Sequence, residues 1–211
     1  MRLYEPLSGN ILDNGKQYQD YKVSDYRSLF FTVFQDFTIY NVSVAENVLM
    51  DLVKTDEDEK RVIDALKKVG LYDKVKNTKD GIYTLISKEF SDSGLVLSGG
   101  EKQKLAIARA LCSSAEIFVF DEASSALDPI SEHDINSLIL SLAKDKTVIL
   151  ISHRLSTTRD VDVIYLLEDG KVKEQGSHEQ LMQLNGEYAR MFTIQSRQYL
   201  RNMTDTCRED Y

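Results

Sequence analysis

Leu97-Ser98-Gly99-Gly100-Glu101 is the stretch that decides the fold of this chain, together with the later stretch Ile117-Phe118-Val119-Phe120-Asp121-Glu122. Four consecutive bulky apolar residues open the second stretch, so it predicts a strand buried on both faces of a parallel sheet. Two carboxylates follow at the end of that strand, where open α/β sheets bind ligands. Such a pair can hold a divalent cation and polarise a water molecule. For this stretch alone, a core strand that ends in two solvated acids is the alternative.

The first stretch predicts the start of a helix that can bind an anion. Ser98, Gly99 and Gly100 precede apolar positions that keep helical spacing, namely Leu105, Ala108 and Leu111. The backbone N–H groups of these three residues therefore lie at the positive end of the helix dipole, and glycines allow a phosphate to approach the main chain closely. The Ser98 hydroxyl can donate to a phosphate oxygen or simply cap the helix.

The order of the motifs resembles the nucleotide-binding domain of ABC ATPases. The stretch from Leu97 resembles the family's signature motif and the stretch from Ile117 its Walker B motif. Three further segments resemble other motifs of the family. The D-loop corresponds to Ser125-Ala126-Leu127-Asp128, the H-loop to Ile149-Leu150-Ile151-Ser152-His153, and the Q-loop, which comes first in the chain, to Phe34-Gln35-Asp36. Three segments resemble the exporter branch of the family, which carries drugs, lipids or peptides. They are Arg2-Leu3-Tyr4-Glu5-Pro6, the segment from Ile151 to Thr157, and Glu174-Gln175-Gly176-Ser177-His178-Glu179.

This resemblance implies an α/β fold with a parallel-sheet core like that of the P-loop (RecA-like) NTPases, an inserted helical subdomain and an antiparallel edge. The expected ATPase core comprises residues 1–40 and 112–211, and the expected helical subdomain comprises residues 41–111 and ends in the signature helix. The family's phosphate-binding loop G-x-x-x-x-G-K-[ST], called Walker A, does not occur in the sequence. The chain therefore resembles a domain truncated within or before that loop, and as given we expect it to be inactive. Whether Met1 is a true start or a fragment boundary stays open.

The resemblance assigns ATP and Mg²⁺ as cofactors and gives each matching residue a role. Glu122 corresponds to the general base for the attacking water, and Asp121 to the residue that holds Mg²⁺. Gln35 corresponds to the Q-loop residue that approaches Mg²⁺ and the water, and His153 to the residue that contacts the γ-phosphate. A structural histidine at the end of a strand is the alternative for His153.

The signature residues act in the family on the nucleotide of a second subunit. Ser98, Gly99, Gly100 and Glu101 are therefore expected to bind ATP across a head-to-tail dimer of ABC domains. Asp128 in the D-loop is expected at the same interface. Glu101 stands where the family most often has glutamine, and its negative charge near phosphate predicts modestly weaker binding.

The expected function is ATP hydrolysis that powers an ABC exporter on the cytoplasmic face of a membrane, with a transmembrane domain as partner. The chain is expected to be soluble and cytosolic, because it has no apolar run of about twenty residues. A net charge of −8 argues against a nucleic-acid partner. The alternatives are a catalytically incomplete or regulatory ABC fragment and a soluble ABC ATPase without a transport role, but the sequence lacks the coiled-coil heptads that the latter needs.

Local patterns predict the remaining elements. An Asn14-Gly15 turn and an Asp169-Gly170 turn predict hairpins. Capping-box patterns predict helices after Ser43 and Ser177, and apolar spacing predicts helices over residues 56–69 and from Ser131. We expect Cys112 in the core, His133 and His178 on the surface, and a frayed tail after Arg197. The segment from Thr84 to Gly94 resembles the exporter X-loop, and its Glu89 is a candidate contact to the membrane domain.

Overall fold

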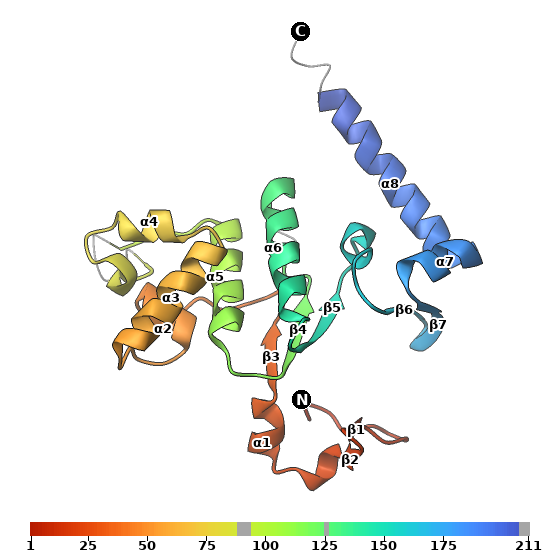
Figure 1. Ribbon diagram of the computed structural model, residues 1–211, viewed down its shortest axis with the longest axis horizontal. Coiled ribbons are helices and arrows are strands. Elements are labelled where there is room, and N and C mark those ends of the chain that lie inside the picture. Colours follow the sequence, from red (N-terminus) through yellow and green to blue (C-terminus); the bar gives the residue numbers. More distant parts are fainter. Residues whose placement is uncertain (88–93, 125–126, 207–211) are drawn as a thin grey trace. The chain divides into compact units, whose positions relative to one another are not determined.

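The computed structural model describes residues 1–87, 94–124 and 127–206 (Figure 1). The chain divides into two compact units, Met1–Ile151 and Ser152–Tyr211. Each unit is described by itself below. Two predicted features, Glu89 and the first half of the D-loop, Ser125-Ala126, lie outside the described residues.

A three-stranded parallel sheet forms the centre of the first unit, in the order β3-β4-β5. The strands are β3 (Phe30–Val33), β4 (Ile117–Asp121) and β5 (Thr147–Ile151). Helix α6 (Pro129–Leu142) carries the chain from β4 back to β5, as a parallel connection requires. The prediction of a parallel-sheet α/β core with antiparallel strands elsewhere is confirmed.

The two faces of this sheet are covered unequally. Phe118 and Phe120 of β4 are buried in the main apolar core, which also includes residues of α6 and of helix α5 (Gly99–Cys112). On the opposite face Val119 is only half-buried, and its neighbours on β5, Ile149 and Ile151, are 45% and 51% exposed. The prediction that β4 is buried on both sides is therefore wrong for this chain, because the other described elements of the first unit leave Val119 and its β5 neighbours partly accessible on that second face.

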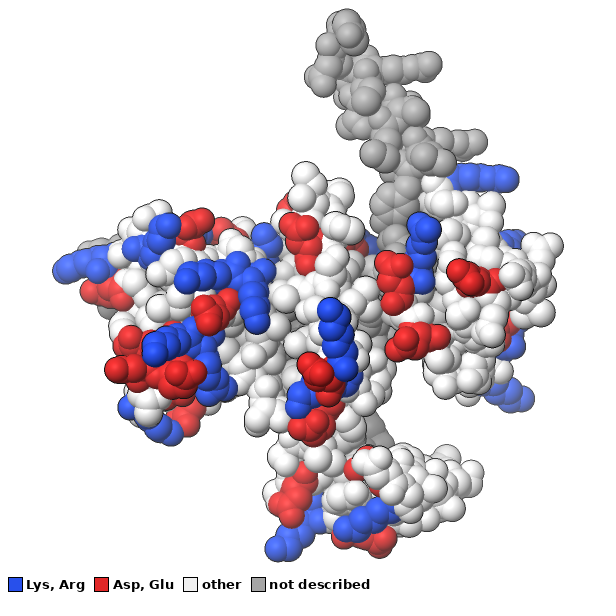
Figure 2. Space-filling view, in the orientation of Figure 1, with Lys and Arg blue, Asp and Glu red and all other residues white. Residues whose placement is uncertain are grey.

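Four helices pack together between β3 and β4 in the sequence: α2 (Val44–Leu49), α3 (Asp56–Lys68), α4 (Tyr72–Lys76) and α5 (Gly99–Cys112). Capping boxes start α2, α3 and α5, with Ser43, Thr55 and Ser98 as N-cap residues. Helix α3 turns a buried stripe inward, which comprises Val62, Ala65 and Leu66. Acidic and basic side chains alternate over this helical region in Figure 2, without a basic patch on the face shown.

A buried arginine fastens α5 to the segment that follows β3. Arg109 donates hydrogen bonds to the carbonyl oxygens of Thr38 (2.7 Å) and Asn47 (2.7 Å), and to Oδ1 of Asn47 (2.8 Å). The Asn47 side chain is fully buried and in turn donates to the carbonyl oxygen of Tyr40 at 2.9 Å. Burial lowers the pKa of Arg109. The chain after β3 is thus fixed to α5 by charge-assisted hydrogen bonds.

The N-terminal part of the first unit is a small hairpin and a short helix. Strands β1 (Leu12–Asp13) and β2 (Lys16–Gln17) pair antiparallel around the predicted Asn14-Gly15 turn. The 3-10 helix η1 (Tyr18–Asp20) and α1 (Val23–Ser28) follow and lead into β3. A second 3-10 helix, η2 (Gly81–Tyr83), lies between α4 and α5. Cys112, expected in the core, is half-buried and packs against it.

The second unit contains an antiparallel hairpin and two helices. After the 3-10 helix η3 (Leu155–Thr158) come β6 (Ile164–Glu168), β7 (Lys171–Gly176), α7 (His178–Leu184) and α8 (Glu187–Thr206). The strands join at the predicted Asp169-Gly170 turn, and Ser177 caps α7 through the predicted capping box. The small core comprises Leu155, Ile164, Leu181 and Tyr188.

Two predictions for the second unit are wrong. His178 is not a surface residue: it is half-buried, its Nδ1 lies 2.9 Å from the Tyr188 hydroxyl, and its ring packs on Phe192. The predicted frayed tail after Arg197 is helical as far as Thr206, because α8 continues to that residue. Within the part of the chain that the structure describes, no helix combines the length and the apolar character needed to cross a membrane.

Candidate functional site

The carboxyl end of β4 carries the two predicted acids. Asp121 is the last residue of the strand, is half-buried, and pairs in register with Ile151 of β5. Glu122 follows directly and leaves the sheet. Because the neighbouring strands run parallel, their carboxyl ends meet at the same edge, and this is where α/β sheets bind ligands. The structure thus brings Asp121 and Glu122 to the edge that the sequence predicts.

The backbone of Glu122 is held in an uncommon conformation from two sides. Its φ angle is +49°, in the left-handed region. Its N–H donates to the carbonyl oxygen of Ile151 at 3.0 Å, and its own carbonyl oxygen accepts from Nε2 of Gln103 at 3.3 Å. Gln103 lies on α5 and is 1% exposed. A buried side chain of the signature helix therefore sets the position of the predicted general base.

Gln35 leaves the adjacent strand at the same edge. Val33, the last residue of β3, pairs with Phe120 of β4, so the chain beyond Val33 departs beside Asp121. Gln35 lies two positions further on and is exposed. The sheet therefore brings the predicted Q-loop residue to the edge that carries the acids.

The signature residues form the exposed start of α5. Ser98 is the N-cap: its Oγ accepts from the N–H of Glu101 at 3.3 Å, and its own N–H donates to Oε2 of Glu101 at 2.8 Å. A Cβ atom added at Gly99 would meet no atom within 4 Å, so the space beside this helix start is open. The first N–H groups of a helix have no partner within it, and those of Gly99 and Gly100 belong to this first turn of α5.

Glu101 is paired with a lysine from another helix. Nζ of Lys74 on α4 lies 2.8 Å from Oε1 and 2.6 Å from Oε2 of Glu101. Burial would raise the pKa of Glu101, but the hydrogen bonds from Lys74 and Ser98 outweigh it and lower that pKa. Glu101, the acidic residue at the fifth position of the signature motif, is thus ionised, and the ammonium group of Lys74 compensates its charge.

Asp128 caps α6. Its Oδ1 accepts from the N–H of Ser131 at 3.0 Å, and the bonds from Ser131 lower the pKa of the exposed Asp128 carboxyl. Lys104 of α5 donates to Oγ of Ser131 at 3.1 Å, so the cap is tied to the signature helix. The carboxylate of the predicted D-loop residue therefore has a structural task in the single chain, and its place at an interface stays a prediction.

His153 belongs to the second unit. It is exposed, and its carbonyl oxygen accepts from Nε2 of Gln195 on α8 at 2.8 Å. Oε1 of Gln195 in turn accepts from the N–H of Leu155 at 2.9 Å. The backbone around His153 is thereby fixed to α8 within its own unit, and its contact with phosphate stays a prediction.

The oxygen donors at the sheet edge suit a hard cation. The carboxylates of Asp121 and Glu122 and the amide oxygen of Gln35 are the ligand type that Mg²⁺ prefers. The described residues hold no group of three or more histidine, cysteine or acidic residues arranged for a metal. These residues therefore fit Mg²⁺ only as a cation shared with phosphate oxygens, which is the usual way in which Mg²⁺ binds at phosphate-transfer sites.

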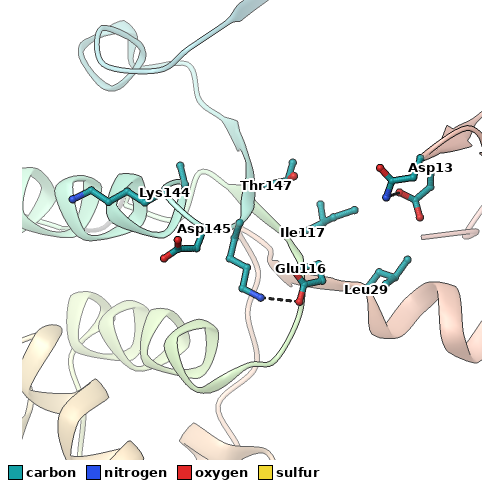
Figure 3. Close-up of a pocket in the computed structure, with 10 residues that line it drawn as sticks. Asp13, Leu29, Glu116, Ile117, Lys144, Asp145 and Thr147 are labelled. Atoms are coloured by element: carbon teal, nitrogen blue, oxygen red, sulfur yellow. Dashed lines mark hydrogen bonds and ion pairs between the residues drawn. The ribbon is translucent and has the colours of Figure 1, made fainter.

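A hollow of about 480 Å³ lies at the opposite end of the sheet (Figure 3). Its lining includes Ile117 and Thr147, the first residues of β4 and β5, together with Glu116 and Lys146, which form an ion pair at 2.8 Å. Strand β4 separates the hollow from Asp121 by about 13 Å at 3.3 Å per residue. The hollow is therefore distinct from the edge that carries the acids.

Three residues of the site were missed by the sequence reasoning. Gln103 supports Glu122, Lys74 pairs with Glu101, and Arg109 holds the segment after β3. Arg109 had a detectable signal, since a charged residue between Ala108 and Ala110 in an apolar helix demands a partner. Lys74 had no such signal, because it looks like any surface lysine.

Comparisons with known proteins agree with this arrangement. A family model described as ABC transporter matches residues 1–125. The ABC multidrug transporter atrD of Emericella nidulans is 37% identical over 195 residues, which are 92% of this chain and 14% of that protein. The sophorolipid transporter of Starmerella bombicola is 37% identical over 196 residues, 92% of this chain and 15% of that protein. This chain thus spans about one seventh of the length of these relatives.

A solved structure shows the same fold. The structure of a bacterial Atm1-family ABC exporter with ATP bound superimposes with a TM-score of 0.81 at 36% sequence identity, and covers 92% of this chain and 33% of that chain. The family model covers more than half of the chain and these relatives match nearly all of it, in agreement with the order of the motifs along the sequence. This chain belongs to the ABC transporter family.

Proposed function

We propose that this chain is the ATP-binding and ATP-hydrolysing part of an ABC exporter and powers the transport of a substrate across a membrane. The observation that carries the proposal is the meeting of Asp121, Glu122 and the segment leading to Gln35 at the carboxyl edge of one parallel sheet. Relatives named as multidrug and lipid transporters, and the similar exporter with ATP bound, support it.

The proposed chemistry divides the polar residues of the edge by task. Glu122 accepts a proton from the attacking water, and a positioned base of this kind contributes about 10²- to 10⁴-fold in rate. Asp121 and Gln35 hold Mg²⁺, which when bound neutralises charge on the phosphates. His153 contacts the γ-phosphate.

A second ABC domain completes the proposed site. Ser98, Gly99 and Gly100 bind the nucleotide held by that second domain, in a head-to-tail dimer with Asp128 at the interface. The open space beside Gly99 supports this arrangement, because the start of α5 offers its N–H groups to a ligand outside the chain. Association of the two domains therefore depends on ATP.

The uncovered face of the sheet supports a further proposal about the phosphate-binding loop. Half-exposed Ile149 and Ile151 next to Val119 form an apolar surface that an additional element would cover. We infer that a strand and helix with the G-x-x-x-x-G-K-[ST] motif pack there in the complete protein. Residues 1–211 alone are then expected to bind ATP weakly and to hydrolyse it negligibly.

The partner of the proposed ATPase is the transmembrane part of the exporter, fused to the chain or separate, so that the chain works at the cytoplasmic face of the membrane. The net charge of −8 and the mixed charges visible in Figure 2 favour a protein partner over nucleic acid.

The proposal is tested in the complete protein by replacing Glu122 with glutamine. Glu122→Gln is expected to lower ATP hydrolysis by at least 100-fold while ATP binding persists, because the amide has nearly the same shape but cannot accept the proton. Glu116→Gln is the matched control, since Glu116 stands at the other end of β4 and its carboxylate pairs with Lys146. It is expected to retain normal hydrolysis.

Each outcome separates the proposal from its competitors. Equal hydrolysis by Glu122→Gln and the unchanged protein would contradict the role of Glu122. Full-strength binding of ATP without hydrolysis by the unchanged complete protein would favour the regulatory alternative. Robust hydrolysis by residues 1–211 alone would refute the proposal that a further segment supplies the phosphate-binding loop.

A further inference from the structure

Lys74 connects α4 to both sides of the signature start. Its ammonium group donates to both carboxylate oxygens of Glu101, at 2.8 and 2.6 Å, and to the carbonyl oxygen of Val96 at 3.2 Å. Val96 precedes the N-cap residue Ser98 by two positions, and Glu101 follows it by three. One cation therefore fixes the chain immediately before and after the residues that point at the proposed nucleotide.

Glu101 is engaged by the same helix start. One of its oxygens accepts from the N–H of Ser98, while its own N–H donates to the Ser98 hydroxyl. The N–H of Lys102 donates to the Ser98 carbonyl at 2.9 Å. The N–H groups of Gly99 and Gly100 have no acceptor among the described residues at this helix start. They are therefore the groups that a phosphate can bind.

A carboxylate beside these two N–H groups opposes the binding of a polyanion. The carboxylate of Glu101 and a phosphate bound at the neighbouring N–H groups carry like charges and repel each other. Near the surface of a protein water screens this repulsion only in part. The Lys74 side chain is 40% exposed and that of Glu101 is 27% exposed, so neither charge is fully solvated. A paired carboxylate presents far less negative potential to the phosphate than a lone one.

We propose that Lys74 is a positioning residue of the nucleotide site: by holding Glu101 in the capping box and compensating its charge, it keeps the N–H groups of Gly99 and Gly100 able to bind phosphate. This inference rests on the proposed function and names a residue that the acidic form of the signature motif requires. With glutamine at position 101 there is no charge to compensate, and the requirement for Lys74 disappears.

The test is a double-mutant cycle in the complete protein, read as KM for ATP and kcat. Lys74→Met is expected to raise KM about fivefold and to leave kcat at saturating ATP unchanged. A fivefold change corresponds to the free energy that a partly exposed ion pair contributes. Lys74→Arg is expected to restore most of the loss. Glu101→Gln is expected to lower KM about twofold, and Lys74→Met added to Glu101→Gln is expected to change KM no further.

Controls separate compensation of charge from simple attachment of α4 to α5. Lys76→Met removes a lysine of the same helix that pairs with Asp73, and it is expected to leave KM unchanged. The effect of Lys74→Met is expected to shrink as salt is raised, because exposed charges are screened. Thermal unfolding of each variant measures the purely structural share of the pair.

Three results would overturn the inference. If Glu101→Gln raised KM as much as Lys74→Met, the pair would be a structural clamp, because both changes break it equally. If Lys74→Met left KM unchanged while the unchanged protein hydrolysed ATP, only the inference would fail. If the unchanged complete protein neither bound nor hydrolysed ATP, the proposed function would fail and the inference with it.

Discussion

The two ends of helix α5 are held in opposite ways. Its start is exposed, and apart from Lys74 the side chains that hold it, Ser98 and Glu101, lie only three residues apart and bond to each other's backbone N–H groups. Its second half is buried, and Arg109 there reaches partners 62 and 71 residues away in the sequence. The difference shows how one helix can present an accessible end to a ligand while the rest of it is fixed in the core.

The largest effect is expected at the buried end. Arg109→Met would remove the donor from the buried Asn47 and from the carbonyl oxygen of Thr38, which is expected to lower the free energy of unfolding of the first unit by about 3 kcal/mol. Urea denaturation measures this loss. Arg190→Met, which breaks an exposed pair with Glu187, is the control, and an equal loss in both variants would erase the contrast between the two ends.

Gln103, in the middle of α5, tests whether the fixed part of the helix serves catalysis. Gln103→Leu removes the hydrogen bond to the carbonyl oxygen of Glu122, so kcat of the complete protein is expected to fall about tenfold with little change in KM, because the proposed base loses its alignment. Lys102→Met, on the exposed side of the same turn, is the control. An unchanged kcat in Gln103→Leu would show that the hydrogen bond from Gln103 is not needed to align Glu122.

A smaller effect is expected at the open end, where two similar caps can be compared. Ser98 and Ser177 each begin a helix with a capping box, one in each unit. Replacing either serine with alanine is expected to lower the stability of its own unit by about 1 kcal/mol. Only Ser98→Ala is expected to raise KM for ATP as well, and a similar rise in Ser177→Ala would speak against a special role of the α5 start.

The smallest effect concerns pH. The N–H of Ser131 lowers the pKa of Asp128 below its ordinary value of 3.8, so the folded state favours the ionised cap. This stabilisation is present above pH 3.8 and is lost as the pH falls through the lower folded-state pKa. In Asp128→Asn, the free energy of unfolding is therefore expected to fall slightly less steeply as the pH is lowered below 3.8. A carboxyl resonance that titrates at or above 3.8 in NMR would contradict this.

The sequence predicted the features that depend on neighbouring residues. The capping boxes at Ser43 and Ser177 and the turns at Asn14-Gly15 and Asp169-Gly170 are confirmed because a few adjacent side chains determine them. The run of apolar residues before Asp121 placed the strand correctly, and with it the edge of the sheet at which the acids lie.

The missed features depend on residues that are distant in the sequence. The pairing of Lys74 with Glu101 follows from the packing of α4 against the loop before α5, which no local pattern encodes. The burial of His178 depends on α8, whose length was itself underestimated because its polar residues resemble a tail. The open face of β4 depends on which distant elements pack against the sheet, and an apolar run alone cannot reveal this.

The left-handed backbone of Glu122 has a consequence for engineering. A non-glycine residue at a φ angle of +49° costs on the order of 1–2 kcal/mol relative to glycine or asparagine, which adopt this conformation readily. A selection for thermostability alone would therefore favour glycine or asparagine at position 122. Such a selection would reward the loss of the proposed base, so libraries that cover this position need a screen for turnover as well as for heat resistance.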